Sequence, residues 1–193
     1  MILHISIKHQ LARILSAGVL FIVCGLLAGA APPECGISMN SLPEIQEFRG
    51  LRLGMTVDEV KLIVPIIEVP HADEFGMART SFSPDFAPKL DKKRFESIRT
   101  VSLEFFDQRL ASIWVGFNGG FKWQSIDSAI EGLSTELHLP PEWQTKPRER
   151  QLVCGDFRLG VSLVSNSPSI RIINDKAKLE WQIRRDAKVD AEP

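Results

Sequence analysis

Hydrophobic positions in residues 51–137 recur twice at the spacing of an amphipathic helix. In the first stretch Val57, Val60 and Val64 repeat every three or four residues until Pro65 ends the pattern. At the start of this stretch, Thr56 and Glu59 have the three-residue spacing of a capping box. The second stretch is longer and ends at a pair of prolines; its apolar stripe comprises Ile126, Ala129, Ile130, Leu133 and Leu137. We therefore predict two helices, one at 57–64 and one at 126–137.

Other segments change between apolar and polar at every residue, which is typical of strands that bury one face. Strict alternation occurs at 113–117, 157–163 and 179–183, and a weaker example lies at 78–82. Residues 102–109 and 169–176 each predict a strand, a tight polar turn and the start of a second strand.

The two sets of elements follow one another at nearly the same interval. The predicted helix starts at Thr56 and Ser125 are 69 residues apart, and the strand patterns match at a shift of 67, which places Trp114 on Trp181. We therefore predict an α+β fold of two tandem helix-plus-antiparallel-sheet modules, each with one helix and about three strands. The modules span 51–117 and 118–185, with Gly119 and Gly120 at the linking turn. Units of this size bury little apolar surface alone, so two of them would share a core.

The first thirty residues have the pattern of an export signal. Lys8 and Arg13 precede an apolar run at 14–27, and an Ala-Gly-Ala sequence at 28–30 suits cleavage. An uncleaved membrane anchor is the alternative, although the run is shorter than the roughly 20 residues that a spanning helix needs. A lipid anchor on Cys24 is not expected, because Val23 is larger than the small residue that acylation signals carry at that place. We expect an exported protein, periplasmic or secreted, with a signal peptide at 1–30, an N-terminal segment at 31–50 and a flexible tail at 186–193.

Charge argues against nucleic acid as a partner. The chain has a formal net charge of −1, and loss of residues 1–30 removes two bases and no acid, which leaves −3. A phosphate-binding protein would carry a basic excess or a basic stripe. We expect neither nucleic-acid binding nor a transmembrane span.

Cysteine usage leaves two interpretations open. Once the leader is removed, only Cys35 and Cys154 remain, and an even number in an oxidising compartment suits a disulfide. Alternatively, Cys154 is a small buried hydrophobic residue in the apolar stretch around it.

Motifs for catalysis, cofactors or metals are absent from the sequence. No Gly-x-Ser-x-Gly or phosphate-binding glycine loop occurs. The polar run at 71–74, with His71, Asp73 and Glu74, could supply a base or metal ligands, and Asp127 and Glu131 could pair on a helix. A solvated loop and a solvated helix face explain them without any chemistry, and we favour these interpretations. We predict no catalytic, cofactor-binding or metal-binding residue. A hydrolase assembled only in three dimensions, or a small-ligand binder in the inter-module cleft, is the alternative.

The segment 70–95 is the predicted binding surface. Its prolines lower the ordering cost of a loop, and its aromatic and basic side chains offer contact area and charge. The candidate residues are Phe75, Phe82, Phe86, Lys92, Lys93 and Arg94. In the alternative interpretation the phenylalanines are ordinary core residues and the charged run is a solvated loop.

The sequence at 53–60, Leu-Gly-Met-Thr-x-x-Glu-Val, resembles the start of the small outer-membrane lipoprotein family that assists β-barrel assembly, the SmpA/OmlA type. There a Gly-Met-Thr or Gly-Met-Ser turn leads into a short helix before a three-stranded sheet. A tandem pair of such units is also similar to the β-lactamase inhibitor protein. Members of both families bind other proteins, so the resemblance implies an exported, non-enzymatic module that binds a protein or another cell-envelope component.

Overall fold

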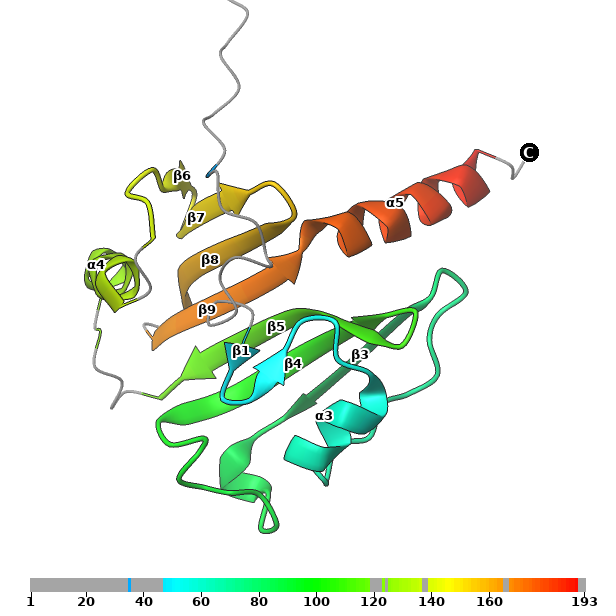
Figure 1. Ribbon diagram of the computed structural model, residues 1–193, viewed down its shortest axis with the longest axis horizontal. Coiled ribbons are helices and arrows are strands. Elements are labelled where there is room, and N and C mark those ends of the chain that lie inside the picture. The colour runs from blue at the N-terminus through cyan, green and yellow to red at the C-terminus, as the bar shows by residue number, and fades with distance from the viewer. Residues whose placement is uncertain are drawn as a thin grey trace, which may run out of the picture. The chain divides into compact units, whose positions relative to one another are not determined.

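The computed structural model describes residues 35, 47–118, 123, 125–136, 139–164 and 167–190, all within one unit that spans Glu34–Pro193. Its main feature is a seven-stranded antiparallel sheet in the order β3-β4-β5-β9-β8-β7-β6 (Figure 1). The strands are β3 (Met77–Phe82), β4 (Ile98–Phe106), β5 (Arg109–Phe117), β6 (Gln144–Lys146), β7 (Glu149–Cys154), β8 (Phe157–Val164) and β9 (Ser167–Asn174).

A two-stranded hairpin and four helical segments accompany the sheet in the described ranges. They are β1 (Glu47–Phe48), β2 (Leu51–Arg52), α3 (Val57–Ile63), the 3-10 helix η3 (Pro84–Phe86), α4 (Ile126–Glu136) and α5 (Asp175–Val189). The predicted capping box begins α3: Thr56 Oγ1 accepts a hydrogen bond from the Glu59 amide, and Glu59 accepts one from the Thr56 amide. This hydrogen bond from the Thr56 backbone, with one from its side chain, lowers the pKa of Glu59.

One face of the sheet, here called the core face, carries the larger apolar cluster. Leu103, Ile113, Ile172 and Leu159 lie opposite one another on four successive strands, and all four are buried. Val60 of α3 and the α4 residues Ala129 and Leu133 belong to the same cluster, so both helices cover this face. The alternating strand pattern thus predicted which side chains are buried.

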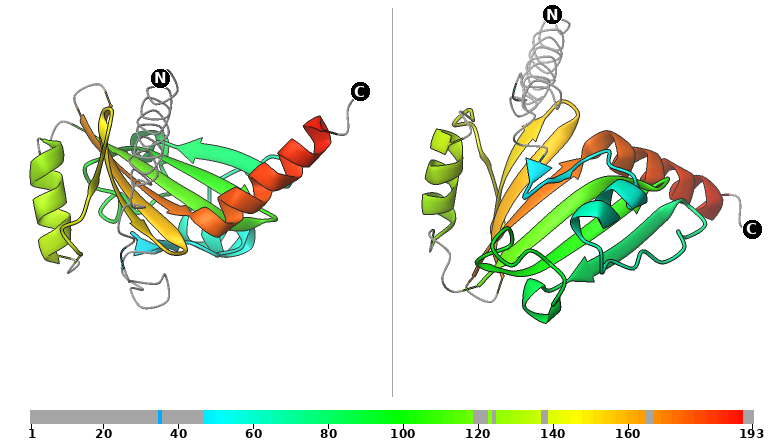
Figure 2. Two further views of the ribbon diagram at one scale, coloured as in Figure 1. Left: turned by 90° about the horizontal axis from the view of Figure 1, so that it is seen from above. Right: turned by 60° about the horizontal axis from the view of Figure 1, so that its bottom comes forward.

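The opposite face, here called the outer face, carries a second and smaller apolar cluster at one end. Met77, Phe106 and Ala111 of the sheet pack there against Ala177 and Trp181 of α5. Figure 2 shows α4 and α5 on either side of the strands that lie between them. The α-helices α3 and α4 send their buried apolar side chains into the larger cluster, so α5 is the described α-helix that packs on the outer face.

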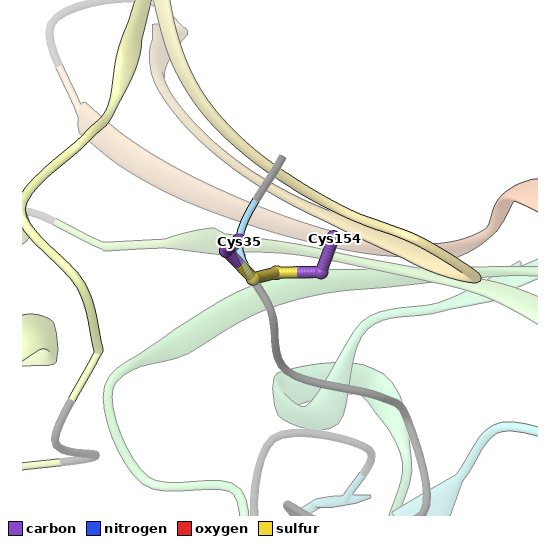
Figure 3. Close-up of a disulfide and its surroundings, with 2 residues drawn as sticks. All are labelled: Cys35 and Cys154. Atoms are coloured by element: carbon purple, nitrogen blue, oxygen red, sulfur yellow. A yellow bond between two sulfur atoms is a disulfide. The ribbon is translucent and has the colours of Figure 1, made fainter. Parts of the chain in front are cut away.

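The disulfide between Cys35 and Cys154 is confirmed (Figure 3). The two Cα atoms are 4.6 Å apart across a sequence separation of 119 residues. The Cys35 amide also donates a 2.9 Å hydrogen bond to the Val153 carbonyl, which pairs this residue in parallel with the edge of β7. Both cysteines are buried in the larger cluster, so the bridge ties the N-terminal segment directly to the core.

The prediction of two helix-plus-three-strand modules is wrong. One continuous seven-stranded sheet is present, and β5 of the first predicted module pairs directly with β9 of the second. The strand expected at 179–183 is part of α5, and the polar turn expected at 174–176 is the start of that helix. Asn174 and Asp175 suit a turn and a helix start equally, because a short polar side chain satisfies free amides in both. The match of Trp114 with Trp181 therefore joins a strand residue to a helix residue.

The first half of the tail predicted at 186–193 is helical, since α5 continues to Val189. Strong helix formers fill α5, Asn174 accepts a hydrogen bond from the Ala177 amide at its start, and Lys188 lies in its last turn. The predicted signal peptide at 1–30 and the linking turn at Gly119 and Gly120 lie outside the described residues. Among the helices in the described ranges, none combines the length and the hydropathy that a membrane-spanning helix needs.

Candidate binding surface

The predicted surface at 70–95 is not one continuous loop, because β3 runs through its middle. Its three phenylalanines lie in different surroundings. Phe82 is buried and packs edge-to-face on Phe95, with ring centroids 5.5 Å apart. Phe75 is partly buried beneath α5, where Lys188 Nζ lies 5.7 Å from its ring centroid. Phe86 is 88% exposed in η3. The structure therefore leaves a single one of these rings available as a large exposed aromatic surface.

The basic residues of the same segment are solvent-exposed. Lys92, Lys93 and Arg94 follow Asp91, whose carboxylate accepts hydrogen bonds from the amides of Lys93 and Arg94. This arrangement is an Asx turn, which holds the three basic residues in a defined backbone conformation. A Cβ on Gly50 of the β1–β2 turn would lie 3.4 Å from an Arg94 guanidinium nitrogen, so Arg94 reaches that hairpin. The phenylalanines and the basic run thus do not form the single surface that the sequence suggested.

His71 lines a hollow of about 630 Å³ between α3, residues 69–72 and the β4–β5 turn. Phe105 and Ala78 of the core face belong to its apolar wall, while Asp58 and Asp107 are its acidic groups. Its remaining lining residues are Thr56, Val57, Lys61, Val69, Pro70, Ala72, Gln108 and Arg109. The sequence therefore located one residue of a real hollow, but the residues around it come from 56–109 rather than from a cleft between two modules.

Three polar residues of this hollow, Thr56, Asp107 and Arg109, already make structural contacts. Arg184 of α5 holds the Asp107 carboxylate with two hydrogen bonds of 2.9 and 2.7 Å, and these bonds raise the pKa of Arg184. Thr56 Oγ1 donates to Glu59 Oε2, and Arg109 donates to the Gly54 carbonyl at 3.1 Å. Among the described residues, the lining combines this apolar wall with charged side chains of both signs, Asp58, Asp107, Lys61 and Arg109.

Asp127 and Glu131 are one possible carboxylate pair on the second helix, with a solvated helix face as the favoured interpretation. Asp127 is exposed and lies 4.0 Å from Arg150 of β7, and Glu131 is exposed as well. Near this helix, Trp123 and Trp143 are partly buried and pack on the larger cluster, and Trp143 Nε1 donates to Ser134 Oγ at 3.1 Å. Within the described ranges, no three histidine, cysteine or acidic residues gather closely enough to hold a metal ion.

The outer face holds an aromatic residue at the centre of the sheet. Trp114 lies on β5 between Ser102 of β4 and Arg171 of β9. Its indole rests over Gly116, because a Cβ on that glycine would come within 2.6 Å of the Trp114 Cη2 atom. Ser102 beside it is small, and Gly116 pairs across the strands with Ser169. The ring therefore lies against the sheet and stays partly exposed.

A charged cluster lies beside Trp114 on the same face. Glu104 of β4 accepts a 2.9 Å hydrogen bond from Arg171 and a 3.2 Å hydrogen bond from Arg79 of β3. Arg171 also donates to Ser112 Oγ at 3.3 Å. Partial burial alone would raise the pKa of Glu104, but the charge of Arg171 and the hydrogen bonds from both arginines outweigh it, so that pKa is lowered. Glu104 is therefore a carboxylate at neutral pH.

Our sequence reasoning missed this face because it used alternation to locate buried residues. The same alternation places Ser102, Glu104, Ser112, Trp114 and Arg171 at the positions that face away from the core. The tryptophan among these polar positions was the signal that could have identified this face. The order of the strands could not be inferred from the sequence, because β5 and β9 are neighbours only in the folded sheet.

Comparisons with known proteins do not identify a function for this surface. No family model, curated protein or solved structure matches the chain. The resemblance to the outer-membrane lipoproteins and to the β-lactamase inhibitor protein therefore stays an expectation from the sequence.

Proposed function

We propose that this protein is an exported, non-enzymatic module that binds another protein through the outer face of its sheet, centred on Trp114. The single observation that carries the proposal is the Trp114 ring lying over Gly116 on a central strand, beside Arg171. Tryptophan and arginine are the residues that most often dominate binding energy at protein interfaces.

The backbone beneath this surface favours binding because it is already ordered. Trp114 lies on β5, which is hydrogen-bonded on both sides to β4 and β9. Its ring is held against Gly116, so little side-chain freedom remains to be lost when a partner binds. Ser102 on the neighbouring strand is partly exposed and offers a hydroxyl to a partner at a low entropic cost. A rigid aromatic residue beside a small polar residue and an arginine is the composition of many recognition surfaces.

Two observations support the exported location. The first thirty residues have the pattern of a signal peptide, and the disulfide joins Cys35 to the core. Disulfides persist mainly in oxidising compartments such as the periplasm and the extracellular space. Mass determination of the protein recovered from its source tests this part: we expect a chain that lacks the leader and gains two protons on reduction. A full-length chain in the cytoplasm would overturn it.

Capture experiments with matched aromatic variants test the binding surface. Tagged wild type, Trp114→Ala and Phe86→Ala are used to recover proteins from an envelope extract of the source cells, after circular dichroism shows that each variant is folded. We expect a partner that wild type and Phe86→Ala recover and that Trp114→Ala loses. Loss in Phe86→Ala alone would place binding in the 70–95 segment and overturn the proposal, as would recovery of no partner above background.

The hollow around His71 favours a second candidate function, the binding of a small molecule. Its volume of about 630 Å³ is within the ordinary range of ligand sites, and it combines an apolar wall with charged groups. A thermal-shift screen against small metabolites, repeated with His71→Ala, tests this candidate. A ligand that stabilises wild type and the variant equally would show that the hollow is not its site.

A further inference from the structure

A hollow of about 140 Å³ lies where α5 meets the outer face. Its charged lining residues come from four different elements: Arg79 from β3, Glu104 from β4, Arg171 from β9 and Lys178 from α5. Trp181 and the apolar side chains of Met77, Ala111 and Ile173 complete it, together with Ser112. One water needs about 10 to 15 Å³ on the same measure, so the hollow has room for a side-chain head group and part of its stem.

Positive charge exceeds negative charge in this hollow. Three cations line it, Arg79, Arg171 and Lys178, and Glu104 is the one anion among its lining residues. Glu104 already accepts hydrogen bonds from both arginines, so it is shared between them. Within the described part of the chain, no carboxylate lies within ion-pair distance of Lys178. The hollow therefore retains an excess of two positive charges.

The walls of the hollow are held in place. The Arg79 guanidinium lies 5.6 Å from the centroid of the Trp181 ring, and the Arg185 guanidinium lies 5.0 Å from that centroid. Both contacts are within the range of cation–π attraction. The Trp181 ring in turn packs on Met77 and Phe106. An incoming anion would therefore meet cations that are already positioned, beside an apolar wall.

We propose that this hollow receives the carboxylate of an aspartate or glutamate side chain presented by the protein that binds the outer face. The excess cations would pair with the carboxylate, and the apolar wall would contact its methylene stem. Arginine suits this role because its planar guanidinium forms two parallel hydrogen bonds to a carboxylate. The inference rests on the proposed function, since the hollow opens beside the surface that contains Trp114 and Arg171.

A titration with a model side chain tests the proposal without a known partner. N-acetyl-glutamate N-methylamide is added to the complete protein at constant ionic strength, and the glutamine analogue is the neutral control. The readout is the indole N–H resonance of Trp181, assigned with Trp181→Phe. We expect a saturable shift with the glutamate compound and none with the glutamine compound. Equal responses, or no response to either, would overturn the proposal.

Three charge variants sharpen this test. Lys178→Gln removes one positive charge and should weaken binding about threefold to tenfold, while Glu104→Gln removes the competing carboxylate and should tighten it. Lys176→Gln, an exposed change on α5 outside the hollow lining, is the matched control and should leave binding unchanged. A similar weakening in Lys176→Gln and Lys178→Gln would indicate only general attraction to a positive helix and would contradict a specific site.

Inorganic phosphate separates a side-chain site from a free-anion site. Phosphate lacks the methylene stem, so it should bind more weakly than the glutamate compound; tighter phosphate binding would overturn the side-chain proposal.

The proposed binding surface and the proposed carboxylate site can fail separately. If the glutamate compound binds but Trp114→Ala still captures the partner, the binding surface is wrong; if capture depends on Trp114 but the compound does not bind, the hollow is wrong.

Discussion

Removal of the Cys35–Cys154 bridge should cost this protein a large part of its stability. The bridge links residues 119 positions apart and therefore restricts most of the unfolded chain. For a closed loop of that length, the chain-entropy model gives about 5 kcal/mol at 25 °C, and measured values are often smaller. We expect the reduced protein to lose about 3 to 5 kcal/mol of unfolding free energy. Because typical domains are stable by about 5 to 15 kcal/mol, this loss would leave a marginal fold.

Urea unfolding followed by tryptophan fluorescence measures this effect. The oxidised wild type is compared with the reduced wild type, which keeps both buried sulfur atoms in the core and isolates the contribution of the cross-link. The double variant Cys35→Ala/Cys154→Ala is the second arm, and it adds the loss of two buried side chains to the loss of the bridge. We expect the reduced chain to unfold at lower urea with a steeper dependence, because its unfolded state exposes more surface.

The result that would refute this reasoning is an equal urea midpoint for oxidised and reduced wild type. It would mean either that the bridge does not form in the protein or that the N-terminal segment contributes nothing to the unfolding transition. The difference in stability between the reduced wild type and the double variant measures the separate contribution of packing by the two sulfur atoms in the core.

The remaining predictions concern the outer face and α5. Gly116→Ala should displace the Trp114 ring, which we expect to shift its fluorescence to the red and to weaken partner capture, at a cost of about 1 kcal/mol in the unfolding free energy; an unchanged emission spectrum would contradict the packing described. Trp181→Phe should change stability by less than about 1 kcal/mol, because the buried indole N–H has no acceptor among the residues that the structure describes, whereas Trp181→Ala should cost about 2 kcal/mol in urea unfolding. The lowered pKa of Glu104 contributes stability that is present above its ordinary value of 4.5 and is lost as the pH falls through the folded-state value, so wild type should lose more stability than Glu104→Gln in acid unfolding curves. Asn174→Ala removes the cap of α5 and should cost about 1 kcal/mol, measured by urea unfolding with circular dichroism; no loss would mean that the cap is dispensable.

Local signals in the sequence predicted several elements correctly. The capping box placed the start of α3, and the strand-turn-strand pattern at 102–109 corresponds to β4, a two-residue turn and β5. Both turn residues, Asp107 and Gln108, have positive φ angles, which tight hairpin turns require. These elements depend on neighbours within a few residues, so they can be inferred without knowledge of the fold.

The error at 175–189 has a physical reason. Leu179, Trp181 and Ile183 alternate with polar residues as in a strand, but in the helix the buried contacts come from Ala177 and Trp181, four residues apart, while Leu179 and Ile183 stay exposed. Alternation over five residues fits both periods, and the strong helix formers on either side were the deciding signal. Composition over a longer window was therefore more informative than the short pattern.

The sequence by itself determined the buried positions of most strands, the start of α3 and the pair of cysteines available for a bridge, because these depend on local periodicity or on residue identity. Only the tertiary structure decided that β5 and β9 are neighbours, that the outer face presents Trp114 beside Arg171, and that α5 closes one end of that face with a positively charged hollow. Such contacts join residues far apart along the chain, for example Glu104 and Arg171, 67 positions apart. Their energies arise only when strands pair in one particular order, and no pattern within a single segment records that order.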